Sequence, residues 1–281
     1  MTICCRHVFL SSGGSTHVEY GIGRFREHNS GTSQCRCRPY TELASVYDTL
    51  MCHVNYPAWS EYIASVLGRF KPDARTILEL ACGTGSLSME LVRRGFSVTC
   101  SDISPPMLRR AAGKFRQSEM PVRIFAADIR TLPVTEYFDA VLCLYDSMNY
   151  LTTPDDFSKA VREAASAVAS GGLFVFDVCT IRNSELFFND RTMVETCGNV
   201  TYERICRYDR RKRIQENHFV FERPDGKPVT ESHYQKIYRL DEIERMLEGA
   251  PFIEIGRFDD MSFESGSENS ERVHFVLQKE Y

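Results

Sequence analysis

The run ILELACGTG, residues 77–85, joins a short apolar segment to a turn of small residues. Residues 76–80 are predicted as a strand, and residues 86–94 as the helix after the turn. Gly83 and Gly85 permit backbone angles that other residues avoid, and they let a ligand approach the main chain closely. The helix presents free N–H groups and the positive end of its dipole. The run therefore predicts a ligand-binding turn between a strand and a helix.

Strands and helices alternate along the chain after this turn. Ser104 followed by Pro105 predicts the N-cap and first turn of a helix that runs to about Arg116. Five apolar strands separated by helices imply a parallel sheet covered on both faces and joined by right-handed crossovers. The predicted fold is therefore α/β, with a doubly wound, Rossmann-like sheet. The predicted strands are 76–80, 97–100, 122–127, 138–144 and 173–178, and the predicted helices are 40–47, 59–70, 86–94, 104–116 and 155–169.

The pattern changes after Arg182. Three segments alternate in the manner of strands, and turn-forming residues separate them, which predicts an antiparallel meander. Residues 1–38, rich in Ser, Gly, Thr, Arg and Cys, are expected to be a disordered tail or an extension, and residues 39–281 to form one domain. The predicted meander strands are 200–208, 214–222 and 229–238; a helix at 240–247 and strands at 252–258 and 272–278 follow.

Acidic residues stand at the ends of the first three predicted strands. Asp102 lies 19 residues after Gly83, where an acid can hold ribose hydroxyls. Asp128 ends the third strand, where it can accept a hydrogen bond from an adenine amino group. Glu79 precedes the turn, and a carboxylate there suits a ligand with an ammonium and a sulfonium group better than a pyrophosphate. A nicotinamide site would usually show a third glycine, but Ser88 occupies that position.

These motifs, in this order, resemble those of class I S-adenosylmethionine (SAM)-dependent methyltransferases. Residues 79–85 are similar to the first motif of that family, E/D-x-G-x-G-x-G, with Ala81 in place of the first glycine. The resemblance implies a seven-stranded sheet of order 3-2-1-4-5-7-6, in which the last strand is antiparallel. It also implies SAM as the cofactor. The residues that it implies for SAM binding are Tyr47, Glu79, Ala81, Cys82, Gly83, Gly85, Asp102, Ile103, Met107, Asp128, Ile129, Leu144 and Tyr145.

A closer resemblance is to bacterial small-molecule methyltransferases, in which an antiparallel insertion forms a lid over the acceptor. Residues 190–239 occupy the place of that lid, and residues 40–59 resemble the N-terminal cap of these enzymes. Asp146 and Asn149 follow the fourth strand, and they either face the acceptor or stabilise a turn. His218 and His233 lie in the meander, where each either faces the acceptor or serves the sheet. Asp177 ends the fifth strand and either points into the site or caps a turn. The predicted catalytic candidates are Asp146, Asn149 and His218.

Composition limits the class of protein. The chain has 281 residues and a formal net charge of −4, without the basic excess typical of duplex-binding proteins, so no nucleic-acid partner is expected. It has no apolar run of about 20 residues and no signal-peptide core, so no membrane partner is expected. The 11 cysteines are expected to be reduced thiols of a cytoplasmic protein.

The predicted activity is transfer of the SAM methyl group to a nitrogen or oxygen atom of a small-molecule acceptor. A methyl group on a positively charged sulfur needs only in-line positioning, so neither a catalytic triad nor a metal is required. Two alternatives remain at this point: an NAD-dependent oxidoreductase on a similar core, and a SAM-binding protein without catalytic activity. The sequence does not indicate an oligomeric state.

Overall fold

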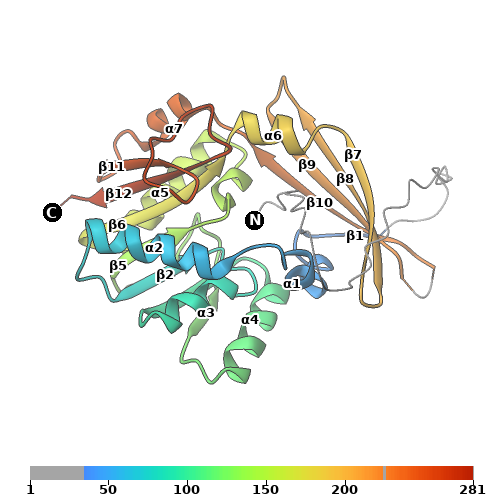
Figure 1. The fold of residues 1–281 in the computed structure, drawn as a ribbon, viewed down its shortest axis with the longest axis horizontal. Helices are drawn as coiled ribbons and strands as arrows, with labels where there is room; N and C mark the ends of the chain where they lie inside the picture. Colours follow the sequence, from blue (N-terminus) through green and yellow to red (C-terminus); the bar gives the residue numbers. More distant parts are fainter. Residues whose placement is uncertain (1–34, 224–225, 281) are drawn as a thin grey trace, which may run out of the picture.

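The computed structural model describes residues 35–223 and 226–280, and these residues form two sheets with helices around the larger one (Figure 1). The larger sheet has the order β11-β12-β6-β5-β2-β3-β4. Numbered along the chain, this is the predicted order 3-2-1-4-5-7-6, which is thereby confirmed. Its strands are β2 (Thr76–Leu80), β3 (Ser97–Asp102), β4 (Arg123–Ala126), β5 (Phe138–Cys143), β6 (Val168–Cys179), β11 (Phe252–Asp259) and β12 (Arg272–Lys279).

The five strands from β2 to β6 are parallel to their neighbours, and β12 pairs with β6 in the antiparallel direction, as predicted. Successive side chains of the central strands enter opposite faces of the sheet. Ile77 belongs to the core on one face and Leu78 to the core on the other. Both faces are therefore apolar, which explains why these strands appear as continuous hydrophobic runs in the sequence.

Helices cover both faces of this sheet. Side chains from α2 (Tyr56–Phe70), α3 (Ser86–Arg93) and α4 (Pro105–Gln117) pack on one face. Those of α5 (Pro154–Ala167) and α7 (Leu240–Leu247) pack on the other. The predicted start of α4 is confirmed, because the Ser104 hydroxyl accepts a hydrogen bond from the Met107 N–H and prolines occupy the first turn. In the described part of the chain, no helix has the length and apolar character needed to cross a membrane.

The smaller sheet, which we call the second sheet, has five strands, two more than the predicted meander. It consists of β1 (Cys35–Cys37), β7 (Arg191–Cys197), β8 (Val200–Asp209), β9 (Ile214–Phe221) and β10 (Val229–Lys236), in the order β1-β10-β9-β8-β7. Strand β1 pairs with β10 in parallel, so the expectation of a tail is wrong for residues 35–37. Residues 1–34, to which the same expectation applied, lie outside the described residues. Strand β7 pairs with β8, and β8 pairs with β9, in the antiparallel direction.

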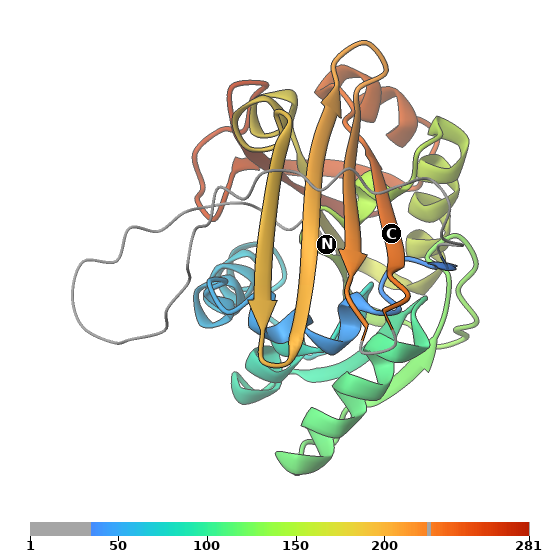
Figure 2. The ribbon, with the colours of Figure 1, turned by 90° about the vertical axis from the view of Figure 1, so that its right-hand side faces the viewer.

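The second sheet lies across one end of the core (Figure 2). It is joined there to η2 (Ser147–Tyr150), the short 3-10 helix that follows β5. The side-chain amide of Gln235 donates to the Asp146 carboxylate (2.7 Å), and that of Asn149 donates to the Lys236 carbonyl (2.8 Å). The inner face of the second sheet is thus anchored beside the carboxyl end of β5.

Three short helices complete the fold. The 3-10 helix η1 (Leu43–Ser45) and the helix α1 (Tyr47–Leu50) lie between β1 and α2, where the sequence predicted a single helix over 40–47. Helix α6 (Ile181–Phe187) connects the core to the second sheet.

Candidate active site

The turn after β2 has the left-handed backbone that its small residues predict. The φ angles are 52° at Ala81, 59° at Gly83 and 73° at Gly85. An added Cβ atom at Gly85 would lie 2.5 Å from the Phe115 ring, so only glycine fits there. Ala81 carries its methyl group in a conformation that costs an L-residue roughly 1–2 kcal/mol. The replacement of glycine at this position is therefore a source of local strain.

Asp102 holds this turn in place. Its carboxylate accepts hydrogen bonds from the backbone N–H groups of Gly83 (2.8 Å) and Ser104 (2.8 Å). The Ala127 N–H donates to the Asp102 carbonyl (3.1 Å). The turn, Asp102 and the end of β4 therefore lie at the same edge of the sheet, as the predicted SAM site requires.

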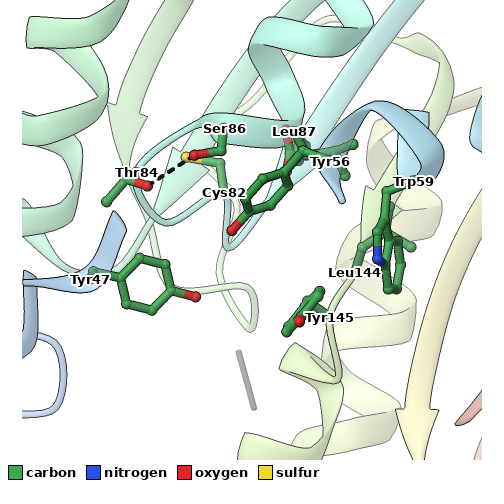
Figure 3. A pocket seen from close by; sticks show the side chains of 10 residues that line it. Tyr47, Tyr56, Trp59, Cys82, Thr84, Ser86, Leu87, Leu144 and Tyr145 are labelled. Atoms are coloured by element: carbon green, nitrogen blue, oxygen red, sulfur yellow. Dashed lines mark hydrogen bonds between the residues drawn. The ribbon is translucent and has the colours of Figure 1, made fainter. Parts of the chain in front are cut away.

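A pocket opens beside this turn. It contains about 350 Å³ of empty space, part of it open to solvent. The hydroxyl ends of Tyr47 and Tyr56 point into the same space, and Tyr145 and Trp59 lie at its side (Figure 3). Of the predicted cofactor residues, Tyr47, Glu79, Cys82, Leu144 and Tyr145 line this pocket, together with Tyr56, Trp59, Thr84, Ser86 and Leu87, which were not predicted.

Glu79 is the acidic group of the pocket. Its side chain is buried and accepts a hydrogen bond from the Ser88 hydroxyl. Burial raises the pKa of Glu79 to about 7, and the Ser88 hydrogen bond limits that rise. An ammonium group in the pocket would stabilise the ionised form. The carboxylate can pair with the ammonium group of SAM. The four aromatic rings around the same cavity can attract its sulfonium, so the residues present fit this cofactor.

A polar cluster lies beside the pocket at the start of α3. The Lys114 ammonium donates to Asp48 (3.0 Å), Thr84 (3.0 Å) and Ser86 (2.8 Å). The Thr84 hydroxyl also donates to Asp48 (2.6 Å). This cluster connects α1, the turn and α4, and so fixes the position of Tyr47 relative to the turn.

The remaining predicted cofactor residues lie around the pocket and do not line it. Ile103 is 63% exposed beside the turn, and Met107 is packed in the core. Ile129 packs against the core on the opposite face of the sheet. The Asp128 carboxylate is engaged by the Arg130 guanidinium (2.6 and 2.9 Å), which lowers the pKa of Asp128. An adenine amino group would therefore share this carboxylate with Arg130.

Asp146 belongs to a buried ionic cluster. The Arg272 guanidinium pairs with Asp146 (2.8 Å) and with Asp177, and Asp177 also accepts the Asp146 backbone N–H (2.8 Å). Burial raises the pKa of both carboxyl groups, and Arg272 opposes that rise. The same guanidinium lies over the ring of Tyr145, 4.9 Å from its centroid. Asp146 and Asp177 thus support the wall of the pocket, which favours the structural alternative for both.

Asn149 also has a structural role. Its side-chain oxygen accepts the Cys179 N–H (3.0 Å), and its amide nitrogen donates to the Lys236 carbonyl (2.8 Å). The side chain is fully buried. These contacts join β6, η2 and β10, which favours the structural alternative for Asn149.

His218 lies on the outer face of the second sheet. Inward and outward positions alternate along β9, and His218 falls on the outer face, where it bonds to Ser232 of β10 (2.7 Å). This position favours the alternative in which His218 serves the sheet. His233, the other meander histidine, is buried on the inner face.

Several residues of the site were not predicted. Tyr56 and Trp59 lie on α2 at helical spacing, where aromatic residues usually indicate core packing. Arg272 begins an apolar strand, and a charged residue in that position was the one available signal. Glu231 and Gln235 flank His233 on the inner face of β10 and were not predicted, because no apolar stripe marks that face in the sequence.

Comparison with known proteins identifies the family. A family model described as a methyltransferase domain matches residues 77–172. YqeM of Bacillus subtilis (strain 168), named as a methyltransferase, is 32% identical over 244 residues, which cover 85% of this chain and 97% of that protein. The glycine/sarcosine N-methyltransferase of Parasynechococcus marenigrum (strain WH8102) is 37% identical over 106 residues, 37% of this chain.

Solved structures agree with the sequence relatives. The crystal structure of an S-adenosylmethionine-dependent methyltransferase from Clostridium acetobutylicum ATCC 824 matches with a TM-score of 0.74 and 25% identity, covering 86% of this chain and 99% of that one. The alternative of an NAD-dependent oxidoreductase is therefore wrong. With the fold, the turn and the acidic aromatic pocket in agreement, the chain belongs to the class I SAM-dependent methyltransferases.

Proposed function

We propose that this methyltransferase transfers the SAM methyl group to a nitrogen or oxygen atom of a small molecule held between the pocket and the second sheet. The observation that carries the proposal is one cavity lined by Glu79 and by the rings of Tyr47, Tyr56, Trp59 and Tyr145. When bound, SAM supplies a methyl group on a sulfonium, a good leaving group. Aromatic faces attract such a cation without competing for the methyl group.

The chain's own residues supply position and exclude water. Glu79 holds the ammonium end, and Asp102 fixes the turn that carries the backbone of Gly83. The second sheet acts as a lid, because the Gln235 side chain and the Lys236 carbonyl anchor it beside the carboxyl end of β5. Alignment of an acceptor with the methyl group contributes about 7–11 kcal/mol in reactions of this kind.

An amine is the favoured acceptor class. The partial relative named above acts, by its name, on glycine and sarcosine, which are both amines. The inner face of the second sheet is rich in polar side chains, among them Asn217, His233 and Gln235, which are buried and hydrogen-bonded to their neighbours in the protein. Calorimetry with SAM, followed by transfer from methyl-labelled SAM to glycine, sarcosine and glucosamine, tests the proposal.

Two results would contradict it. An intact protein with no affinity for SAM would remove the cofactor half of the proposal. Affinity for SAM without labelled product, either from the three amines or from small-molecule extracts, would instead support the alternative of SAM binding without catalysis.

A further inference from the structure

Four side chains form a continuous hydrogen-bonded line between the second sheet and the segment before η1. The His233 Nε2 atom lies 2.8 Å from a Glu231 carboxylate oxygen, and its Nδ1 atom lies 3.1 Å from the Tyr150 hydroxyl. The Tyr150 hydroxyl lies 2.6 Å from that of Tyr40. The histidine is 2% exposed and Glu231 is fully buried. The line crosses three segments of the chain: β10, η2 and the residues before η1.

The direction of these hydrogen bonds follows from Glu231. Its carboxylate accepts the backbone N–H groups of Tyr40 (2.6 Å) and Glu42 (2.9 Å), among others. Burial raises the pKa of Glu231, but His233 and these N–H groups outweigh it and hold the pKa below its usual value. An ionised carboxylate only accepts, so Nε2 of His233 donates to it. Nδ1 of the neutral ring is then the acceptor, and the Tyr150 hydroxyl donates to it.

The charge state of His233 suits proton acceptance. Burial lowers the pKa of this histidine, and Glu231 opposes that effect. The charged and titratable groups that face it are Glu231 from its own strand, Arg204 from β8, Tyr150 from η2 and Tyr40 from the segment before η1. The imidazole is therefore neutral near pH 7, and a carboxylate is in place to stabilise the imidazolium.

The line ends one aromatic ring away from the SAM pocket. The Tyr40 ring makes an edge contact with the ring of Tyr47, with centroids 6.0 Å apart, and Tyr47 lines the pocket. Burial raises the pKa of Tyr47, and charge on Tyr56, Tyr145 or Tyr150 would raise it further. The ring of Tyr47 thus connects the Tyr40 end of the line to the pocket.

We propose that Glu231, His233, Tyr150 and Tyr40 form a proton relay that removes the proton of the methyl acceptor, an inference that rests on the proposed function. The electron pair that the departing proton leaves on the acceptor forms the new bond to the methyl carbon. The bond from that carbon to sulfur breaks, and its electron pair stays on sulfur as a neutral thioether. The acceptor's proton passes to the Tyr40 oxygen, the Tyr40 proton passes to the Tyr150 oxygen, and the Tyr150 proton passes to Nδ1 of His233. Glu231 stabilises the resulting imidazolium.

A relay of this kind favours acceptors that carry a proton to be removed. It serves an acceptor that arrives protonated, such as an ammonium or a hydroxyl group, because a neutral tertiary amine has no proton to give. The acceptor class inferred is therefore a primary or secondary amine, or an alcohol, small enough to fit beneath the second sheet.

The kinetic test compares His233→Gln and Tyr150→Phe with His218→Gln, a matched histidine substitution on the outer face of the same sheet. Methyl-labelled SAM and glycine, sarcosine or glucosamine are the probes. Below the pKa of the amine, we expect the two relay variants to lose about 10²-fold in kcat and to keep the SAM affinity of the wild type. The loss should shrink as pH rises above the amine's own pKa, because solvent then removes the proton.

His218→Gln should match the wild-type protein at every pH. A kcat loss in His233→Gln that is constant across pH would indicate a structural role and overturn the relay. Wild-type rates in both relay variants would overturn it as well.

A second measurement does not depend on turnover. In ¹⁵N-histidine NMR spectra of the full chain, His233 should carry its proton on Nε2, and Tyr150→Phe should shift the Nδ1 signal. A proton on Nδ1 at neutral pH would overturn the relay. If the wild-type protein binds SAM but methylates none of the three amines, the proposed function fails for amines, and the NMR result alone then decides whether the relay stands.

Discussion

At the residue scale, Ala81 is a strained position that can be relieved. Its φ of 52° is the conformation in which glycine avoids a steric cost. We expect Ala81→Gly to raise the free energy of unfolding by about 1 kcal/mol. Urea denaturation of the two proteins measures this difference.

Ala112→Gly is the matched control, because Ala112 lies within α4. Glycine in a helix lowers stability by roughly 0.5–1 kcal/mol, so the two substitutions should have opposite signs. Destabilisation by Ala81→Gly would mean that the methyl group contributes packing that outweighs its strain.

Glu79 should make SAM binding depend on pH. Its pKa of about 7 must fall when an ammonium group binds beside it, so binding below pH 7 requires the loss of a proton. Calorimetry should therefore give an affinity that weakens by up to about tenfold for each pH unit below 7. Glu79→Gln should bind at least about tenfold more weakly at pH 8 and lose this dependence.

The same group affects the ligand-free protein. Its pKa in the folded state, about 7, lies above the ordinary value of 4.5. Its contribution to stability is therefore complete below pH 4.5 and is lost as pH rises through 7, by on the order of 3 kcal/mol. A stability curve for Glu79→Gln that still falls over this interval would point to another group.

At the scale of elements, Asn149 joins three of them. Asn149→Ala would leave the Cys179 N–H and the Lys236 carbonyl buried without this partner. We expect a loss of about 2–4 kcal/mol in the free energy of unfolding, because each unsatisfied group costs about 1–3 kcal/mol. Thermal unfolding measures it, and a variant with unchanged stability but no methyl transfer would restore Asn149 as a catalytic candidate.

The elements of the core could be predicted from the sequence, and those of the second sheet only in part. Strands such as 76–80 are apolar on both faces, and α4 has a clear cap and prolines at its start. Strand β7 has no buried face, so its residues carry no periodic signal. Strand β1 has three residues and depends on pairing with β10, which lies far away in the sequence.

The residues of the candidate site could also be predicted only in part. Glu79 and Asp102 could be found because they lie at fixed positions around the turn. The sequence could not show which of His218 and His233 faces inward. The inner face of β10 is polar, so the apolar alternation that usually marks the buried face of a strand is missing.

At the scale of the whole molecule, Arg272 is the cation that allows two carboxylates to be buried where the core meets the second sheet. Arg272→Met would leave Asp146 and Asp177 without this partner. We expect a loss of about 3–5 kcal/mol in the free energy of unfolding at neutral pH, from denaturant titrations. The loss should diminish as pH falls, because protonated carboxyl groups no longer need a cation.

A triple variant with Arg272→Met, Asp146→Asn and Asp177→Asn provides the comparison. It removes the cation and both negative charges together, and it should recover much of the lost stability. Equal instability of the single and triple variants would assign the effect to the packing of Arg272 on Tyr145 instead.

The sequence contains one tryptophan, and it lies in the wall of the SAM pocket. Trp59 is 6% exposed, and its ring centroid lies 5.2 Å from that of Tyr145. Its intrinsic fluorescence is consequently a label-free optical signal from this one location. Adding SAM should change the emission in a saturable manner that follows the calorimetric curve, whereas Trp59→Phe should be optically silent, so that occupancy of the pocket can be read in real time.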